Sequence, residues 1–231
     1  MRRWPYPWPT VEPNALSILP PSRARENMGV SLNELAFPLV RELMERADYY
    51  GIEVHEAGCG AHVLDLGVRV PGGLEAGLRM VEVCLGGLGK ASLTWMRLGG
   101  LTVPAVSVWT DRPALATLGS QMAGWKLELH GKVILGSGPA RALVRKPKRV
   151  FKALGHEERA GLAILALEAD ELPDDEFLTK VASSCGLGPE ALYVLVVPLN
   201  SPAGMVQVVG RAIETCLLKL MNLGMDVKAI R

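Results

Sequence analysis

The sequence predicts an α/β fold built on a mixed β-sheet. Strand-like and helix-like segments alternate from residue 31 onwards, which is typical of a sheet covered by helices. Several of the strand-like segments are joined by short glycine-containing turns, so we expect antiparallel neighbours rather than a purely parallel sheet. Two continuous apolar segments, residues 160–169 and 191–199, are typical of buried strands.

The first half of the chain carries clear helix and hairpin signals. Ser31 followed three residues later by Glu34 is a capping-box pattern, and Pro38 places the start of the regular helix near that proline. Glu75, Arg79 and Glu82 recur at helical spacing and predict an exposed stripe. The elements expected here are helix 31–50, strands 52–57 and 62–70, helix 72–89, a hairpin of strands 90–98 and 101–110, and helix 111–125.

The second half continues the same alternation. Acidic residues at the start of the segment 173–186 and a glycine at its end are typical of a helix. The elements expected here are strands 126–131 and 132–136, a turn over 136–143, a basic helix over 146–154, strand 160–169, helix 173–186, strand 191–199, helix 207–220 and a final strand over 225–231. This order again favours a mixed sheet.

Composition excludes several classes of function. The 231 residues are 49% hydrophobic and 21% charged, as in ordinary globular proteins. The formal net charge of +1 gives no electrostatic attraction to nucleic acid or to an anionic membrane. No segment approaches the roughly 20 apolar residues that a membrane-spanning helix needs. We therefore expect a cytoplasmic protein that binds neither nucleic acid nor a membrane.

The cysteines and histidines give no metal-binding pattern. The chain has four of each, and neither set has the spacing of a zinc site. They are Cys59, Cys84, Cys185, Cys216, His55, His62, His130 and His156. Free cysteines in a reducing cytosol are the simpler interpretation, and we expect no bound metal.

Residues 1–30 form a separate zone of the sequence. Six of the 16 prolines lie there, without any periodic pattern. Proline fixes φ and removes a hydrogen-bond donor, so this zone is expected to be an extended or disordered extension. Met28 is a second candidate for the true start of the protein. The predicted domain covers residues 31–231.

The segment LGSGPARAL, residues 135–143, joins a predicted strand to a predicted helix start. Free main-chain amides at such a position can hold an anion, the glycines let a ligand approach, and Arg141 adds positive charge. A plain strand-to-helix connection is the alternative, and the physical pattern alone favours that alternative.

The predicted helix 207–220, QVVGRAIETCLLKL, has an unusual polar side. Gln207, Arg211 and Glu214 lie on that side, but Leu218 falls among them, which indicates partial burial. A carboxylate beside a guanidinium in a half-buried cleft can act as a general base, whereas an exposed ion pair would have no such role. Periodicity alone favours the exposed pair. The predicted core face is Val206, Val209, Ile213, Cys216, Leu217 and Leu220.

Four blocks of the sequence carry a family resemblance. GGLEAGLRMVEVCLGGLG, LGSQMAGW, LGSGPARAL and VQVVGRAIETCLLKL resemble the methenyltetrahydromethanopterin cyclohydrolases, in the same order and with few gaps over about residues 32–231. The resemblance implies an α/β subunit of two parts with a pterin cleft between them, assembled as a homotrimer. It implies reversible hydrolysis of 5,10-methenyltetrahydromethanopterin, or its dephospho form, to the 5-formyl product in one-carbon metabolism.

The resemblance also implies roles for particular residues. Arg211 and Glu214 match an Arg-x-x-Glu pair in which the glutamate handles water and its proton while the arginine holds it and tunes its pKa. Ser137, Gly138, Arg141 and Gln207 are the expected substrate-binding residues. No metal or redox cofactor is expected, because the cationic methenyl carbon is already activated. The same step serves methanogenesis and formaldehyde oxidation in opposite directions.

One difference from the family concerns length. Family members continue past the position that matches Arg231, so we expect this chain to be truncated at its C-terminus. A core that lacks strands exposes unpaired edges and apolar surface, so weak solubility or weak activity is expected. An inactive pterin-binding fragment or relic of the enzyme is the alternative function.

Overall fold

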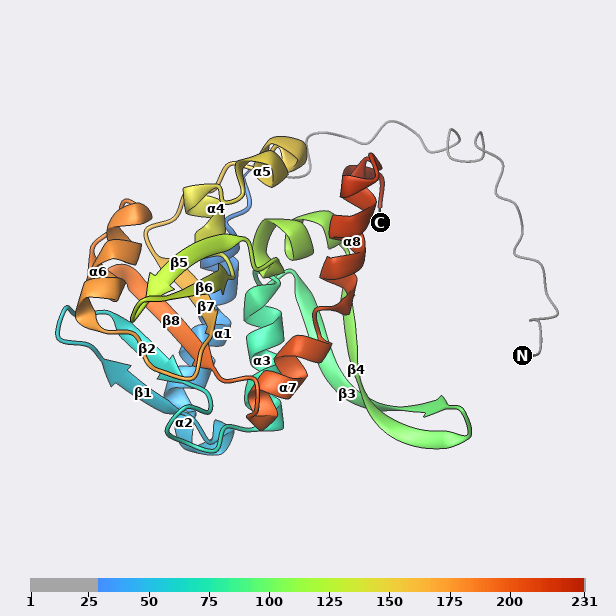
Figure 1. Cartoon of the computed structure of the whole chain (residues 1–231), viewed down its shortest axis with the longest axis horizontal. Helices are drawn as coiled ribbons and strands as arrows, with labels where there is room; N and C mark the ends of the chain where they lie inside the picture. The colour runs from blue at the N-terminus through green and yellow to red at the C-terminus, as the bar shows by residue number, and fades with distance from the viewer. Residues whose placement is uncertain (1–28, 231) are drawn as a thin grey trace.

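The computed structural model describes residues 29–230 and confirms the mixed α/β fold (Figure 1). The main sheet has six strands in the order β1-β2-β8-β7-β6-β5. Strands β2, β8 and β7 are parallel neighbours, whereas the β1–β2, β6–β7 and β5–β6 pairs are antiparallel. Residues 1–28, the larger part of the predicted extension, lie outside the described range. The predicted division into two parts with a cleft stays a prediction.

Most strands follow the expected positions, but the strand expected over 62–70 ends at Asp65. The strands are β1 (Glu53–Glu56), β2 (His62–Asp65), β3 (Gly89–Leu98), β4 (Leu101–Thr110), β5 (Trp125–Leu129), β6 (Lys132–Ser137), β7 (Ala163–Glu168) and β8 (Leu192–Val197). Among residues 29–230, strands β3 and β4 pair only with each other, as a long antiparallel hairpin that projects from the body of the molecule (Figure 1).

The helices are mostly short. They are α1 (Leu32–Glu45), α2 (Ala47–Tyr50), α3 (Leu74–Cys84), the π-helix η2 (Leu115–Gln121), α4 (Ala140–Val144), α5 (Lys148–Leu154), α6 (Asp175–Ser184), η3 (Pro189–Ala191), α7 (Pro202–Val209), α8 (Ala212–Asn222) and η4 (Val227–Ala229). Helices α1 and α3 cover one face of the main sheet and α6 covers the other, whereas α7 packs on α3 and α8 packs on η2. Among residues 29–230, no helix combines the length and the apolar composition that crossing a membrane requires.

Alternating side chains of the central strands build two cores. Ile164 of β7 and Leu195 of β8 face a core shared with α1 and α3. Leu165 and Val194, one residue away on the same strands, face a second core shared with α6. This arrangement follows from the period of two in a strand, and it explains why both segments read as continuously apolar.

The start of α1 is fixed by a distant carboxylate as well as by its own cap. The Ser31 side chain accepts the N–H of Glu34, as the capping pattern predicted. The Ser31 hydroxyl also donates to Glu158, 127 residues away. The helix begins at Leu32 and contains Pro38 in its interior, so the expectation of a regular start near Pro38 was wrong. Pro38 lies beyond the first turn, so it removes the helical hydrogen bond that its position would otherwise donate to the Glu34 carbonyl.

Two further expectations were wrong for physical reasons. Glu82 was placed on an exposed stripe, but it is 1% exposed. Its carboxylate can be buried because it accepts a hydrogen bond from the main-chain N–H of Ala91 and forms an ion pair with Arg79. These contacts tie the base of the β3–β4 hairpin to α3. The segment over 225–230 forms the short helix η4 rather than a strand, started by the Asp226 side chain, which accepts the N–H of Lys228.

Candidate active site

The segment predicted as one helix over 207–220 is two helices separated by a break. Helix α7 ends at Val209 and α8 begins at Ala212, with Gly210 and Arg211 between them. Gly210 has ordinary helical φ, so its role is close packing: an added Cβ would lie 2.7 Å from Cγ2 of Val81 on α3. The break brings the chain against α3 and then turns it toward η2 and α5.

This break explains which side chains are buried. Val206 and Leu217 are buried as predicted. Val209, Ile213 and Leu220 were predicted as core but are 56%, 36% and 36% exposed, and Cys216 is exposed as well. A single 100° period does not continue through the break, so the two helices bury different sides. The buried side includes the two polar residues Gln207 and Glu214.

The C-terminal end of η2 lies at the centre of the candidate site. Arg211 donates through one guanidinium nitrogen to the main-chain carbonyl of Gln121, and the Gln121 side-chain amide donates to the carbonyl of Gly210 at 3.1 Å. The last carbonyls of a helix have no partner within it and favour cations. A π-helical turn is also a frequent feature of functional sites. Sequence reasoning placed a helix here but did not identify Gln121 as a site residue.

Arg141 occupies the same helix end from the other side. Its side chain is 0% exposed and donates to the carbonyls of Ser120 at 3.0 Å, Lys146 at 2.9 Å and Leu118 at 3.3 Å. Burial lowers the pKa of Arg141 to about 9, against the opposing field of Glu214. The predicted contact of Arg141 with a substrate stays a prediction, and the contacts present hold the protein together.

Glu214 is buried beside these two arginines. Glu214 is 7% exposed and lies in the first turn of α8. Burial raises the pKa of the Glu214 carboxyl, and the charges of Arg211 and Arg141 oppose that rise. Within residues 29–230, no hydrogen bond contributes to this balance. The arrangement keeps a carboxylate with unused acceptor capacity next to two fixed positive charges, which suits a group that takes and returns a proton.

The glycine turn after β6 reaches the same place. The Gly138 N–H donates to the carbonyl of Ser120 at 3.0 Å, and Gly138 has φ of 91°, which favours glycine. The buried Ser137 hydroxyl donates to the carbonyl of Ala166 at 3.3 Å and lies 4.0 Å from the Cys84 sulfur. Burial raises the pKa of the Cys84 thiol, and the charge of Arg211 opposes that rise. All four cysteines are free, as expected.

Some buried polar atoms of this region have no partner within residues 29–230. They are Oγ of Ser120, Oε1 of Gln121 and Oε1 of Gln207. Gln207 was a predicted site residue, whereas Ser120, Gln121 and Cys84 were missed as individual residues. The block LGSQMAGW was the only sequence signal that contained Ser120 and Gln121. Unpartnered buried polar atoms are uncommon in folded proteins.

One group of side chains elsewhere has the composition of a metal site. Glu53, His55 and Asp65 each offer one ligand atom, all within 4.8 Å of one another. The Asp65 carboxylate already accepts the main-chain N–H groups of Gly67, Val68 and Arg69. Those bonds hold the loop after β2 and leave fewer lone pairs for a cation.

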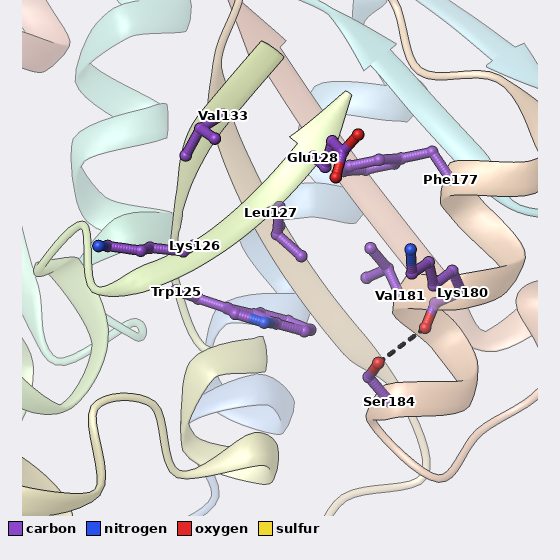
Figure 2. Close-up of a pocket in the computed structure, with 9 residues that line it drawn as sticks. All are labelled: Trp125, Lys126, Leu127, Glu128, Val133, Phe177, Lys180, Val181 and Ser184. Atoms are coloured by element: carbon purple, nitrogen blue, oxygen red, sulfur yellow. Dashed lines mark hydrogen bonds between the residues drawn. The ribbon is translucent and has the colours of Figure 1, made fainter. Parts of the chain in front are cut away.

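A cavity of about 380 Å³ lies between β5 and α6, and Figure 2 shows the side chains that line it. Trp125 and Phe177 give it an apolar floor, and Lys126 and Lys180 lie at its sides. The Ser184 hydroxyl donates to the Lys180 carbonyl of the same helix, so it is already satisfied. None of the predicted site residues lines this cavity. The cavity is therefore separate from the candidate site.

Known proteins match the chain over this whole region. The model of the family described as Cyclohydrolase (MCH) matches residues 31–231. A methenyltetrahydromethanopterin cyclohydrolase of Methanocella arvoryzae is 41% identical over 202 residues, which are 87% of this chain and 64% of that protein. Proteins of the same name from Methanospirillum hungatei and Methanocaldococcus jannaschii are each 40% identical, with the same coverage.

The residues that the family model matches include every element of the candidate site, from α3 through η2 and the glycine turn to α8. The chain spans 64% of the length of these curated relatives. A family model that covers residues 31–231, together with about 40% identity to the relatives, shows that the chain belongs to the cyclohydrolase (MCH) family.

Proposed function

We propose that the chain carries the catalytic pair for reversible hydrolysis of 5,10-methenyltetrahydromethanopterin, or of its dephospho form, to the 5-formyl compound. The observation that carries this proposal is the buried Glu214 carboxyl beside Arg211 and Arg141, with its pKa raised by burial. Support also comes from the family membership and from relatives that bear the name of this enzyme. No metal or redox cofactor takes part in the proposed reaction.

The chemistry needs one base that later acts as an acid. Water attacks the cationic methenyl carbon, its oxygen forms the new bond to carbon, and Glu214 accepts a proton from that water. The adduct then loses one carbon–nitrogen bond, and the proton returns from Glu214 to the departing nitrogen. The hydroxyl of the adduct becomes the formyl carbonyl and releases its proton to solvent, so one proton is released for each turnover. A carboxyl with a raised pKa is suited to both transfers.

The two arginines have separate parts in this mechanism. Arg211 lies at the start of α8 and is fixed on the Gln121 carbonyl, so its charge is held one turn away from Glu214. Arg141 adds a second fixed charge from the opposite side of the η2 end. Both charges oppose the effect of burial and favour the ionised form of Glu214. A buried carboxylate also attracts the cationic substrate.

The substitution Glu214→Gln tests this assignment, because it keeps the shape and removes the base. We expect turnover to fall by about 10²–10⁴-fold, with binding of the methenyl compound retained. Glu128→Gln, a change on the exposed β5 surface, is the matched control and should leave turnover unchanged. Product formation by mass spectrometry and binding by calorimetry separate the two effects. Wild-type turnover in Glu214→Gln contradicts the mechanism.

The wild-type chain itself decides between the proposed enzyme and the alternative of an inactive pterin-binding fragment. Hydrolysis by wild type that requires Glu214 supports the enzyme. Binding without hydrolysis supports the fragment, and absence of both refutes a pterin function for this chain.

Assembly as a homotrimer in the cytoplasm is part of the proposed function, as the family resemblance implies. The β3–β4 hairpin supports self-association, because Trp95, Leu98 and Leu101 are 71%, 63% and 69% exposed. Large exposed apolar surfaces are typical of contact sites between proteins. Light scattering should give a mass close to three times 24.8 kDa. A mass of one chain contradicts the trimer.

A further inference from the structure

We propose that Gln121 is a positioning residue for the Arg211–Glu214 pair, because its side chain and its main-chain carbonyl together hold the break between α7 and α8. This inference rests on the proposed function and deepens it by naming what fixes the catalytic pair. Gln121 is the last residue of η2 and is 1% exposed.

The side chain of Gln121 makes one specific contact. Its Nε2 donates to the Gly210 carbonyl at 3.1 Å, which is 89 residues further along the chain. Within the described residues, its Oε1 is buried and has no partner, so this single bond is what fixes the orientation of the amide. The Gly210 carbonyl lies at the end of α7, where a helix leaves carbonyls without internal partners. Gln121 therefore satisfies a carbonyl that the break would otherwise leave buried and unpaired.

The main chain of Gln121 makes the second contact. Its carbonyl accepts the guanidinium of Arg211, the residue directly after Gly210. Two successive residues of the break are thus bound by one residue of η2. A substitution at position 121 keeps the carbonyl but loses the side-chain bond, which leaves the break held at one point instead of two.

The end of η2 is itself rigid, so it can serve as a fixed reference. Arg141 binds the carbonyls of Leu118 and Ser120, and the Gly138 N–H also binds the Ser120 carbonyl. Leu118 packs in a core with Leu217 of α8. The glycine turn, η2 and α8 are therefore connected through a few residues around Gln121.

Glu214 depends on this connection because it lies in the first turn of α8. The first turn of a helix is the part that frays most easily. Loss of the bond to Gly210 should loosen that turn, expose Glu214 to water and move it relative to the bound substrate. Small displacements of a catalytic group reduce the rate without a matching change in binding.

The test compares Gln121→Met with Thr117→Val. Methionine has a length similar to glutamine but no donor for Gly210. Thr117 is a buried residue of the same π-helix whose hydroxyl donates to the Pro113 carbonyl at 2.6 Å, so Thr117→Val also removes one side-chain bond but does not touch the break. Gln121→Asn, one methylene too short to reach Gly210, replaces Gln121→Met should that variant fail to fold.

Four quantities are measured on each variant of the full chain. They are the melting temperature, kcat and KM for the methenyl compound, and the midpoint of the Glu214 carboxyl titration by ¹³C NMR, assigned with Glu214→Gln. We expect both variants to lower the melting temperature. Only the Gln121 variant should lower kcat, by about 10–100-fold at unchanged KM.

The titration distinguishes positioning from general stability. Arg211 and Arg141 are the charged groups whose fields reach Glu214. Because burial is the largest influence on the pKa of Glu214, opening the first turn should lower the midpoint in the Gln121 variant, with no change in Thr117→Val. Equal kcat and equal midpoints in the two variants would overturn the inference. Should wild type lack turnover, the proposed function fails, and the titration still decides the role of Gln121.

Discussion

Two buried glutamates of this chain have opposite surroundings. Glu158 is 9% exposed, and its carboxylate accepts hydrogen bonds from Ser31 Oγ, from the N–H groups of Leu32 and Asn33, from Asn33 Nδ2 and from His156 Nε2, at 2.8–3.2 Å. Glu214 is 7% exposed, and within residues 29–230 only the charges of two arginines compensate its burial. Equal burial therefore leads to different chemistry.

The difference shows in the pKa values of the two carboxyls. Burial alone would raise the pKa of Glu158, but the bonds from His156, Asn33, Ser31 and Leu32 outweigh it and lower the pKa to about 2. Burial dominates at Glu214 and raises its pKa. A satisfied carboxylate holds a fold together and resists protonation, whereas an unsatisfied one keeps its affinity for a proton. The contrast identifies Glu158 as structural and Glu214 as the candidate for chemistry.

Removal of the satisfied carboxylate should have the largest effect on stability. Glu158→Ala leaves the start of α1 and the buried His156 ring without their partner, so we expect a loss of about 3–5 kcal/mol in the free energy of unfolding. Glu157→Ala is the matched control, since Glu157 is exposed and, within the described part of the chain, forms an ion pair only with Arg145 at 3.5 Å. The free energy of unfolding of Glu157→Ala should lie within about 0.5 kcal/mol of the wild-type value. Urea unfolding of both variants measures the difference, and similar losses would contradict the structural role.

Acid should remove the same stabilisation without mutation. The folded-state pKa of Glu158 is about 2, below the ordinary value of 4.5, so its contribution is fully present above pH 4.5 and is lost as the pH falls toward 2. That contribution is on the order of 3 kcal/mol. The measurement is the free energy of unfolding between pH 6 and pH 2.5 in wild type and in Glu158→Gln. The two curves should converge at low pH, and parallel curves would show that Glu158 is not the group responsible.

The same contrast explains what the sequence could predict. The Ser31 cap and the buried strands β7 and β8 follow from local patterns, because their partners lie within a few residues or within one period. The bonds between Glu158 and the start of α1 join residues more than 120 positions apart, and no local pattern contains them. Glu82 was placed on the surface for the same reason, since its partner Ala91 belongs to the β3–β4 hairpin.

The candidate site was predictable only in part. Arg211 and Glu214 were identified as a pair through the family resemblance. The structure binds Arg211 to the end of η2 and buries Glu214 within reach of the Arg211 charge. Periodicity favoured a continuous helix with an exposed polar side, because it could not detect the break at Gly210. Gly210 packs closely against Val81 of α3, a contact between distant parts of the chain that no local pattern contains.

The break can be tested directly, with a smaller effect on stability. Gly210→Ala places a methyl group 2.7 Å from Val81 Cγ2, and the backbone there already has helical φ, so the clash is the main change. We expect a loss of about 1–3 kcal/mol and a shift of the Glu214 pKa toward its ordinary value. Gly161→Ala, where an added Cβ meets no atom within 4 Å, should change stability by less than about 0.5 kcal/mol. Thermal unfolding compares the two, and equal melting temperatures would show that close packing at Gly210 is unimportant.

The smallest expected effect on stability is that of Glu214→Gln. It is a gain rather than a loss, so it distinguishes Glu214 from Glu158 most clearly. The pKa of Glu214 is raised in the folded state, so the folded protein binds the proton more tightly than the unfolded chain does. Its ionisation therefore costs stability, and this cost appears as the pH rises from below 4.5 through the folded-state pKa. Glu214→Gln removes the charge and should stabilise the chain at pH 7, while it should leave stability nearly unchanged at pH 4. Melting temperatures at both pH values measure this, with Glu128→Gln on the exposed surface as the control.

A gain in stability from Glu214→Gln, together with the loss of turnover, would mean that the fold bears a cost to keep this carboxylate buried. Such a cost is typical of residues kept for activity rather than for folding. Glu158→Gln should behave in the reverse way at pH 7, because there the charge is what the surrounding donors require. A loss of stability in Glu214→Gln at pH 7 would show that Glu214, like Glu158, stabilises the fold through its charge. That result would remove the physical basis for Glu214 as the base.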